Sequence, residues 1–249
     1  MTIAAGFLCR DGIVLAADTE YTANAKFQGT KIWCQEADDT ALILAGAGPA
    51  VSLGYIRDRI FRLLTPSMKP EAIADMVEDV LHRFFTRYVP QGKAEDAPSL
   101  LFGIRYEQDF HLYQTAAAPP PAKVDRWACV GWGGDLGQYL ADLFYRPEES
   151  VAYTECLAAY VVYQAKLHSA YCGGKTDIVS LTTNELTPMI RPRRERIAEM
   201  ERYFDSFHVG FGSLLSVGSD LSLSDDLVDR RLKRFDKWVR QWRQSECYG

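Results

Sequence analysis

The chain opens with two short apolar runs on either side of an Asp-Gly step. The first run spans residues 2–9, the second spans residues 13–18, and Asp11 and Gly12 lie between them. Asp-Gly between apolar segments favours a β-hairpin, because both central residues of a type I′ turn need a positive φ. The sequence therefore predicts a strand, a tight turn through Asp11-Gly12 and a second strand.

Further strands and helices follow in blocks rather than in strict alternation. Apolar runs predict strands over residues 31–34, 41–46, 99–106, 109–115, 125–130 and 177–182. Apolar residues at helical spacing predict helices that begin at Pro49 and at about Glu71, and helices over 135–145 and 150–168. Blocks of strands and blocks of helices indicate an α+β fold in which two antiparallel sheets stack and helices lie outside them.

Residues 186–249 follow the last of these predicted strands. Residues 192–207 are predicted to be helical, and the Gly/Ser/Leu-rich stretch 209–224 is predicted to be a linker or loop. Residues 225–244 predict a second helix, which we expect to pack on the body or on a neighbouring subunit. Four aspartates on that helix argue against its lying on a membrane. We therefore divide the chain into a domain over 1–185 and a mostly helical extension over 186–249.

Composition and charge argue against several classes of protein. The chain of 249 residues is 47% apolar and 24% charged, with a net charge of −5, which does not fit a nucleic-acid-binding face. It has neither an apolar run of membrane-spanning length nor a signal-peptide pattern at its start. The six cysteines are scattered, and the four histidines form no ligand cluster. We expect a cytoplasmic protein without metal, cofactor, nucleic acid or membrane partner.

Thr2 is the candidate nucleophile. Because the second residue is small, we expect Met1 to be removed, so that the mature chain begins with Thr2. Its hydroxyl and free α-amine would then supply a nucleophile and a base on one residue. A free α-amine has a pKa of about 8, and a nearby lysine lowers it by like-charge repulsion. Taken alone, a threonine at position 2 is more often just the second residue of a protein than a nucleophile.

Short motifs in the same order resemble the catalytic β-type subunits of the proteasome and their bacterial relatives, the N-terminal-threonine (Ntn) hydrolases. Besides the opening hairpin they are Thr30-Lys31-Ile32-Trp33, the strand from Ala41 to Gly48, Val130-Gly131-Trp132-Gly133-Gly134, and Cys172-Gly173-Gly174 followed by Asp177 to Thr182. Each motif is weak alone, but together they span residues 2–185. The resemblance implies a four-layer αββα Ntn-hydrolase sandwich of a divergent, bacterial type with a C-terminal extension.

The resemblance also implies roles at single positions. Lys31 would keep the field near the nucleophile positive, and Asp18 would hold the lysine ammonium; the alternative is a surface ion pair worth at most about 1 kcal/mol. Gly46 would donate its N–H to the developing oxyanion, unless a strand-to-helix turn simply needs glycine there. Thr22 would contact a substrate added as a β-strand, with Gly46 and Gly48 as further substrate contacts.

Two supporting positions depart from the family's pattern. Ser169 stands where the family has an acid, and it keeps a hydroxyl but no charge. Cys172 replaces the family's serine and is a weaker hydrogen-bond donor. Both still belong to the expected catalytic environment, but loss of supporting groups can lower activity by orders of magnitude.

From these motifs we predict a threonine peptidase that hydrolyses peptide bonds in peptides or unfolded proteins. The resemblance implies a homo-oligomer, either a ring or a dimer, and leaves room for an unfoldase partner. One alternative is a non-catalytic scaffold subunit, which the changes at Ser169 and Cys172 favour and the set of Thr2, Asp18 and Lys31 opposes. A third hypothesis is a small-molecule amidase with the same nucleophile and a different pocket.

Overall fold

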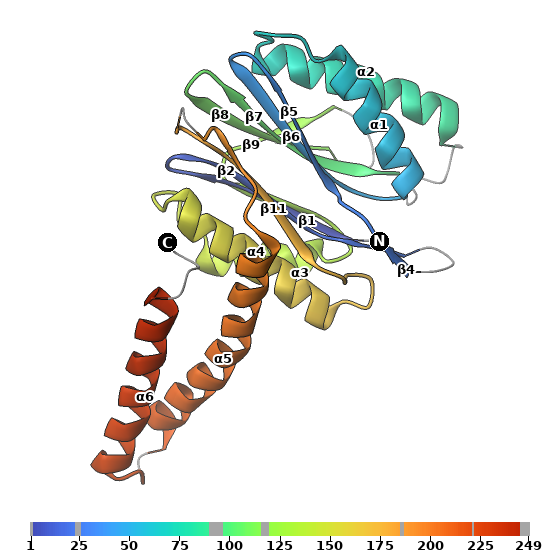
Figure 1. Ribbon diagram of the computed structural model, residues 1–249. Helices are drawn as coiled ribbons and strands as arrows, with labels where there is room; N and C mark the ends of the chain where they lie inside the picture. Colours follow the sequence, from blue (N-terminus) through green and yellow to red (C-terminus); the bar gives the residue numbers. More distant parts are fainter. Residues whose placement is uncertain are drawn as a thin grey trace. The chain divides into compact units, whose positions relative to one another are not determined.

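The computed structural model describes residues 2–22, 26–89, 97–115, 120–184, 187–220 and 222–244. These residues form an α+β fold with three antiparallel sheets and six helices (Figure 1). The chain divides into two compact units, Met1–Pro192 and Arg193–Gly249. The expected α+β class is confirmed, whereas the assignment of one domain to 1–185 and an extension to 186–249 stays a prediction.

Two five-stranded sheets form the body of the first unit. The first sheet has the order β10 (Trp127–Gly131), β1 (Ile3–Cys9), β2 (Gly12–Asp18), β11 (Thr176–Thr182) and β12 (Met189–Ile190). The second has the order β5 (Ile32–Ala37), β6 (Thr40–Ala47), β7 (Ser99–Tyr106), β8 (Asp109–Gln114) and β9 (Ala122–Val124). A separate hairpin consists of β3 (Glu20–Thr22) and β4 (Lys26–Gln28), and every pair of strands is antiparallel.

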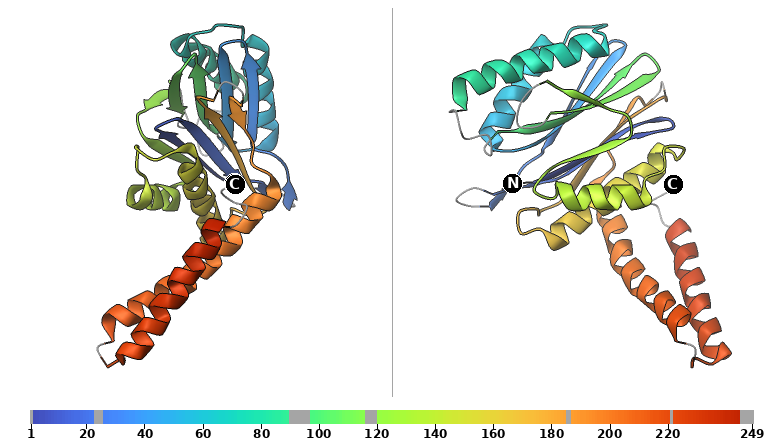
Figure 2. Two further views of the ribbon diagram at one scale, coloured as in Figure 1. Left: turned by 60° about the vertical axis from the view of Figure 1, so that its left-hand side comes forward. Right: turned by 180° about the vertical axis from the view of Figure 1, so that it is seen from behind.

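The two large sheets lie face to face (Figure 2). One buried apolar cluster joins them, and it includes Ile13 and Leu15 from the first sheet and Ile43 and Leu101 from the second. A second cluster joins the other face of the second sheet to α1 (Ala50–Leu63) and α2 (Pro70–Tyr88). On the first sheet, α4 (Val151–His168) packs against β1, β2 and β11, and α3 (Gly134–Phe144) packs against β10.

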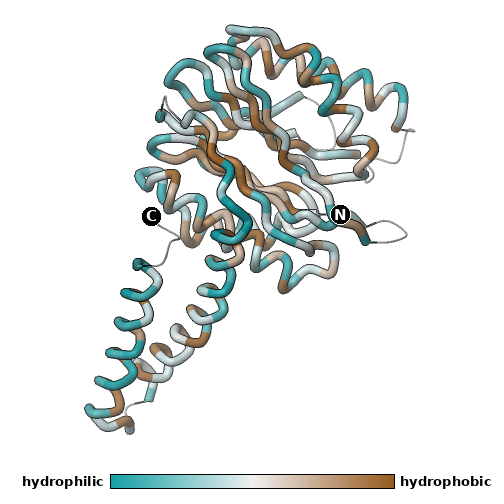
Figure 3. The backbone as a smooth tube through the Cα atoms, in the orientation of Figure 1, coloured by the Kyte–Doolittle hydropathy of each residue, from teal (hydrophilic) through white to brown (hydrophobic). Residues whose placement is uncertain are grey.

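Strand β6 shows how the sequence produces this burial on two faces. Its eight residues are all buried. Leu42 and Leu44 belong to the cluster shared with α1 and α2, whereas Ile43 and Ala45 belong to the cluster between the sheets. Because successive side chains of a strand point to opposite faces, a strand covered on both faces needs a continuous apolar run. Figure 3 shows hydrophobic residues gathered along these central strands.

The opening hairpin is confirmed, but its turn lies one residue earlier than the sequence predicts. Cys9 pairs with Gly12, so Arg10 and Asp11 form the turn. Neither turn residue is among those with a positive φ. Gly12 lies in β2, where an added Cβ would come 2.1 Å from the Leu181 carbonyl oxygen. The glycine is therefore required by the close approach of β11 rather than by the turn.

The second unit contains α5 (Arg194–Ser219) and α6 (Asp225–Gln244). The predicted linker over 209–224 is wrong for residues 209–219, which continue α5. Aromatic residues of the two helices contact one another, as in the pair of Phe207 and Trp238, whose ring centroids lie 6.0 Å apart. Gly210 lets the Phe235 ring approach to 3.1 Å from where a Cβ would stand. At this position, packing between the helices thus offsets the cost of about 1 kcal/mol for a glycine inside a helix.

Candidate active site

The ends of three strands bring Thr2, Asp18 and Lys31 together. Thr2 directly precedes β1, Asp18 ends β2, and Lys31 directly precedes β5. Ala4 lies opposite Ala17, so the antiparallel pairing sets the start of β1 beside the end of β2. Strand β5 lies across the core from β2. All three side chains are almost wholly buried, with exposed fractions of 1% for Thr2 and 0% for Asp18 and Lys31.

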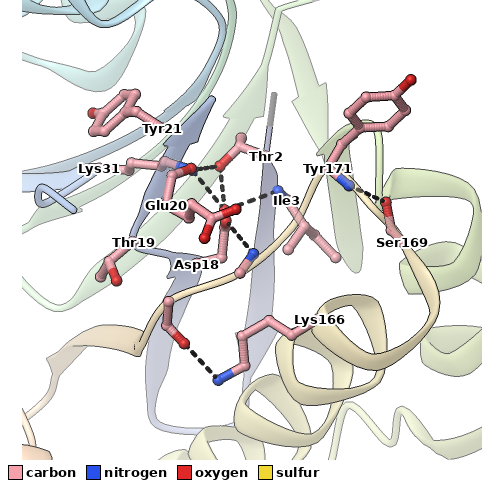
Figure 4. A network of polar contacts seen from close by, with 12 residues as sticks. Thr2, Ile3, Asp18, Thr19, Glu20, Tyr21, Lys31, Lys166, Ser169 and Tyr171 are labelled. Carbon is pink, nitrogen blue, oxygen red and sulfur yellow. Dashed lines mark hydrogen bonds and ion pairs between the residues drawn. The ribbon is translucent and has the colours of Figure 1, made fainter. Parts of the chain in front are cut away.

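These three side chains form one polar cluster (Figure 4). The Thr2 hydroxyl donates a hydrogen bond to Asp18 Oδ1, and Lys31 Nζ donates one to Thr2 Oγ1. Lys31 Nζ also lies 2.8 Å from Asp18 Oδ1. The hydroxyl is therefore held between a cation and a carboxylate, and the two buried charges compensate each other.

Two backbone amides fix the Asp18 carboxylate. The Ile3 N–H donates to Oδ1 at 3.1 Å, and the Gly173 N–H donates to Oδ2 at 3.0 Å. A Cβ at position 173 would come 2.8 Å from the Glu20 carboxylate, so the glycine allows its amide to reach Asp18. With both oxygens bonded, the carboxylate has one orientation toward Thr2 and Lys31.

The surroundings of Lys31 both hold its ammonium group and disfavour its charge. Lys31 Nζ donates to the Glu20 carbonyl oxygen and lies 4.8 Å from the centroid of the Tyr21 ring, within range of a cation–π interaction. Burial lowers the pKa of Lys31, and the charge of Asp18 opposes that shift. Burial also raises the pKa of Tyr21 to about 12, so its hydroxyl stays a donor, here to the Thr30 carbonyl at 3.0 Å.

The glycine-rich turn before α3 packs against the main chain of Thr2. Gly131 has a φ of +91°, and a Cβ at this position would come 2.3 Å from the Thr2 carbonyl oxygen. The Gly133 N–H donates to the same oxygen at 3.4 Å. Only a residue without a side chain fits at position 131, so this turn fixes the backbone of the nucleophile candidate.

Ser169 and Cys172 belong to the loop that carries Gly173. Ser169 is the C-cap of α4, and its hydroxyl accepts a hydrogen bond from the Tyr171 N–H at 3.4 Å. The Cys172 N–H donates to the Ser169 carbonyl at 3.2 Å. Burial raises the pKa of the Cys172 thiol, and its hydrogen bond with Ser169 opposes that shift. These two residues thus shape the loop that presents Gly173 to Asp18, while their catalytic roles stay predictions.

Gly46 and Gly48 each have a structural reason to be glycine. A Cβ at Gly46 would come 2.4 Å from Leu53 of α1, and Gly48 has a φ of +147°. The Gly46 N–H donates to the Lys31 carbonyl at 3.3 Å, so it would have to exchange this bond to serve an oxyanion. The oxyanion and substrate roles of these glycines stay predictions.

Two further expectations concern Thr22 and Met1. Thr22 is the last residue of β3 and lies opposite Lys26 in the β3–β4 hairpin. Its contact with a substrate strand stays a prediction. Met1 lies outside the described residues, so its removal also stays a prediction.

Sequence reasoning missed Glu20, Tyr21 and Gly173 as neighbours of the cluster. Glu20 and Tyr21 lie in a strand of three residues, too short to give a periodic signal. The Gly173-Gly174 pair was a usable signal, because adjacent glycines often mark a close approach of backbone. A contact between this loop and Asp18, however, depends on the pairing of β2 with β11, which the sequence alone does not give.

The described part of the chain contains neither a cluster of metal ligands nor a helix suited to a membrane. Among those residues, no group of three or more His, Cys, Asp or Glu side chains could hold a metal ion. No helix there combines the length and apolar character needed to cross a membrane. Cys9, Cys34, Cys129 and Cys172 are free thiols.

Comparison with known proteins gives structural matches only. No family model matches the sequence, and no curated protein matches it either. Anbu, described as an ancestral beta-subunit, from Yersinia bercovieri has a TM-score of 0.75 at 13% identity, covering 89% of this chain and 99% of that one. A Gly-1 mutant of Anbu from Hyphomicrobium sp. strain MC1 has a TM-score of 0.70 at 18% identity, covering 86% and 99%. The helical assembly of the Anbu complex from Pseudomonas aeruginosa gives 0.73 at 12% identity, covering 90% and 99%.

These matches correct the family assignment made from the motifs. The similar structures are Anbu proteins, so the assignment to the proteasome β-type subunits and Ntn hydrolases is wrong. The motifs at Thr30 to Trp33 and at Cys172 to Gly174 are too short to separate related groups that share one arrangement of strands. At identities below 20% the comparison defines the fold alone. The fold of this chain is Anbu-like.

Proposed function

We propose that this protein is a threonine protease that hydrolyses peptide bonds, with Thr2 as the nucleophile after removal of Met1. The observation that supports this most is the buried cluster in which the Thr2 hydroxyl lies between Lys31 Nζ and Asp18 Oδ1. A hydroxyl placed against a buried cation is easier to deprotonate, because the cation stabilises the alkoxide. The proteasome-like fold agrees with this chemistry.

The proposed reaction has two steps. Thr2 Oγ1 bonds to the carbonyl carbon of the scissile peptide while its proton passes to the free α-amine. The C–N bond then breaks, the α-amine gives the proton to the leaving nitrogen, and the acyl group stays on Oγ1 as an ester. Water attacks the ester carbon, a proton returns to Oγ1, and a carboxylic acid leaves. If Met1 is retained, the Thr2 nitrogen is a peptide nitrogen and cannot accept a proton.

The surrounding residues have supporting roles in this proposal. Lys31 stabilises negative charge on Oγ1, and Asp18 keeps the lysine in place. Gly46 donates its N–H to the oxyanion once its 3.3 Å bond to the Lys31 carbonyl is released. Thr22 and Gly48 bind the backbone of the acyl half of the substrate in an extended conformation.

The test is intact-mass spectrometry before and after exposure to a peptide epoxyketone, which bonds to both the α-amine and the hydroxyl of a terminal threonine. We expect a mass without Met1 and one adduct, mapped to Thr2. Thr2→Ala should form no adduct. The matched control is Thr40→Ala, which removes another wholly buried threonine hydroxyl, bonded to the Met68 carbonyl, and should keep the adduct. A retained Met1 without any adduct would overturn the proposal.

A non-catalytic scaffold is the second candidate function. The engagement of the Gly46 N–H with the Lys31 carbonyl favours it, because that amide is the proposed oxyanion donor. The two functions differ in turnover: a scaffold hydrolyses neither peptides nor small amides. If the adduct forms, a panel of peptides beside small aliphatic amides separates a peptidase from an amidase with the same nucleophile.

The proposal extends to organisation and assembly. Residues 1–185 would form the hydrolase domain, with its two large sheets between two pairs of helices in four layers, and 186–249 an extension. One Anbu neighbour is described as a helical assembly, so we propose that this chain also forms a homo-oligomer. It would act in the cytoplasm on peptides or unfolded proteins, with an unfoldase supplying the latter. Light scattering coupled to size-exclusion chromatography tests the assembly: a monomer at all concentrations would contradict it.

A further inference from the structure

Two exposed aromatic side chains lie next to each other beside the candidate active site. The ring centroids of Trp132 and Tyr171 are 4.8 Å apart, with an angle of 48° between the rings. Trp132 is 62% exposed and Tyr171 is 39% exposed. A single exposed aromatic side chain is ordinary, whereas adjacent exposed rings form a continuous apolar surface of the kind that binds apolar groups.

Both aromatic residues extend from segments that contact the nucleophile cluster. Trp132 lies between Gly131, which packs on the Thr2 carbonyl, and Gly133, which donates to it. Tyr171 lies two residues before Gly173, whose N–H binds Asp18. The two segments also touch, since a Cβ at Gly133 would come 3.1 Å from Cys172 Sγ. The backbone from which both rings extend is therefore held close to Thr2.

The aromatic pair lies on one side of the nucleophile. In Figure 4, Tyr171 extends on the opposite side of Thr2 from Tyr21 and Lys31. The proposed function places the acyl half of the substrate along β3, which contains Tyr21 and Thr22. An extended peptide that crosses Thr2 must then continue toward Tyr171 with its leaving half. Such a path would bring the residue that follows the scissile bond to Tyr171 and to Trp132, whose ring contacts it.

We propose that Trp132 and Tyr171 bind the side chain of that residue and select an apolar or aromatic one. This inference rests on the proposed function, and it names the substrate class that the function leaves open. The physical reason is burial of apolar surface against two rings whose backbone positions are fixed, so little conformational entropy is lost on binding. A small or acidic residue at the same position gains no such contact.

The test uses peptides that differ only in the residue after the scissile bond, with phenylalanine, leucine, glycine or aspartate there. We expect the wild type to prefer phenylalanine to glycine in kcat/KM, and Trp132→Ala to lower that ratio about tenfold or more. Trp132→Phe should keep most of the preference. The matched control is Tyr139→Ala, which removes another aromatic side chain that is 62% exposed, and it should leave the ratio unchanged.

Two further measurements separate failure of this inference from failure of the proposed function. A peptide epoxyketone has no leaving-group residue, so its rate of reaction with Thr2 should be the same in Trp132→Ala as in wild type. If the adduct forms and the phenylalanine preference is unchanged in Trp132→Ala, the inference is overturned while the hydrolase stands. If no adduct forms, the hydrolase proposal fails. Calorimetric binding of the same peptides to Thr2→Ala and to Thr2→Ala/Trp132→Ala then decides: equal affinities overturn the aromatic site, and weaker binding in the double variant supports it.

Discussion

At the scale of single residues, the candidate site consists of a hydroxyl that lies between one buried cation and one buried anion. Lys31 and Asp18 are both wholly buried, and backbone groups add hydrogen bonds to both ions: the Glu20 carbonyl accepts from the ammonium, and the amides of Ile3 and Gly173 donate to the carboxylate. Backbone groups serve well here, because they add hydrogen bonds to the buried ions without adding further charge.

Removing one charge should be more harmful than removing both. Asp18→Asn leaves the Lys31 ammonium buried without its carboxylate, and we expect the free energy of unfolding to fall by about 3–5 kcal/mol. In Asp18→Asn/Lys31→Met neither charge of this pair remains, so stability should recover while the epoxyketone adduct stays absent. Urea unfolding measures the first effect and intact mass the second. Asp236→Asn, which breaks an exposed pair with Arg240, serves as the control and should change little. Equal stabilities of the single and double variants would contradict the idea of compensating charges.

The pKa of Lys31 gives a pH dependence with a definite sign. Burial lowers this pKa in the folded protein below its usual 10.5. Between the lowered pKa and 10.5 the unfolded chain binds more protons than the folded one, so this group makes the free energy of unfolding rise with pH. We expect the wild type to gain stability relative to Asp18→Asn/Lys31→Met as pH rises through that window, as measured by urea unfolding. A difference that stays constant with pH would mean that folding does not shift the pKa of Lys31.

At the scale of elements, long periodic segments could be predicted from sequence and close approaches could not. The runs around β6 and α2 appear as expected, because their side chains repeat with the period of their own element. The short strands β3 and β12 were not predicted, since two or three residues are too few to show a period. Within the site, Thr2, Asp18 and Lys31 were predicted from local motifs, whereas the contact of Gly173 with Asp18 depends on long-range pairing of strands.

Gly12 and Gly54 are a matched pair of glycines that tests whether Gly12 is required by the close approach of β11. At Gly12 an added Cβ would come 2.1 Å from the Leu181 carbonyl oxygen, so Gly12→Ala should lower the free energy of unfolding by about 1–3 kcal/mol. At Gly54, inside α1, nothing lies within 4 Å of the added Cβ, and Gly54→Ala should raise that free energy by about 0.5–1 kcal/mol. Urea unfolding of the two variants gives both values. If Gly12→Ala is as stable as wild type, the close approach of β11 is not what requires glycine.

The glycines of α5 test whether residues 209–219 are helical. In a helix, Gly212→Ala and Gly218→Ala should each stabilise by about 1 kcal/mol, because nothing lies within 4 Å of either added Cβ. Gly210→Ala should gain less, since the Phe235 ring lies 3.1 Å away and must move. Hydrogen exchange of the amides in 209–219 should slow accordingly. A loop would show fast exchange in wild type and no slowing in any variant.

At the scale of the whole molecule, the two units differ in how much apolar surface each element buries. In the first unit β6 is buried along its full length, and two clusters of apolar side chains cover its two faces. In the second unit none of the described residues of α6 is buried, although aromatic rings of α5 and α6 contact each other. A helix of this length without buried side chains is marginal in water, because most helical stability comes from packing.

This difference predicts a hierarchy of local unfolding that hydrogen exchange with mass spectrometry can measure on the full chain. Amides of β6 should exchange only through global unfolding, whereas amides of α6 should exchange through local openings of much lower free energy. Adding urea separates the two, because exchange by global unfolding accelerates steeply with denaturant and exchange by small openings does not. The aromatic contacts stabilise the helix pair of the second unit. Trp238→Ala removes contacts to Phe207 and Phe235, so it should speed amide exchange in α5 and α6 while β6 keeps its rate. If amides of α6 are protected as strongly as those of β6, the second unit is stabilised by contacts beyond those within the helix pair. A homo-oligomer would provide such contacts, and dilution should then remove the protection.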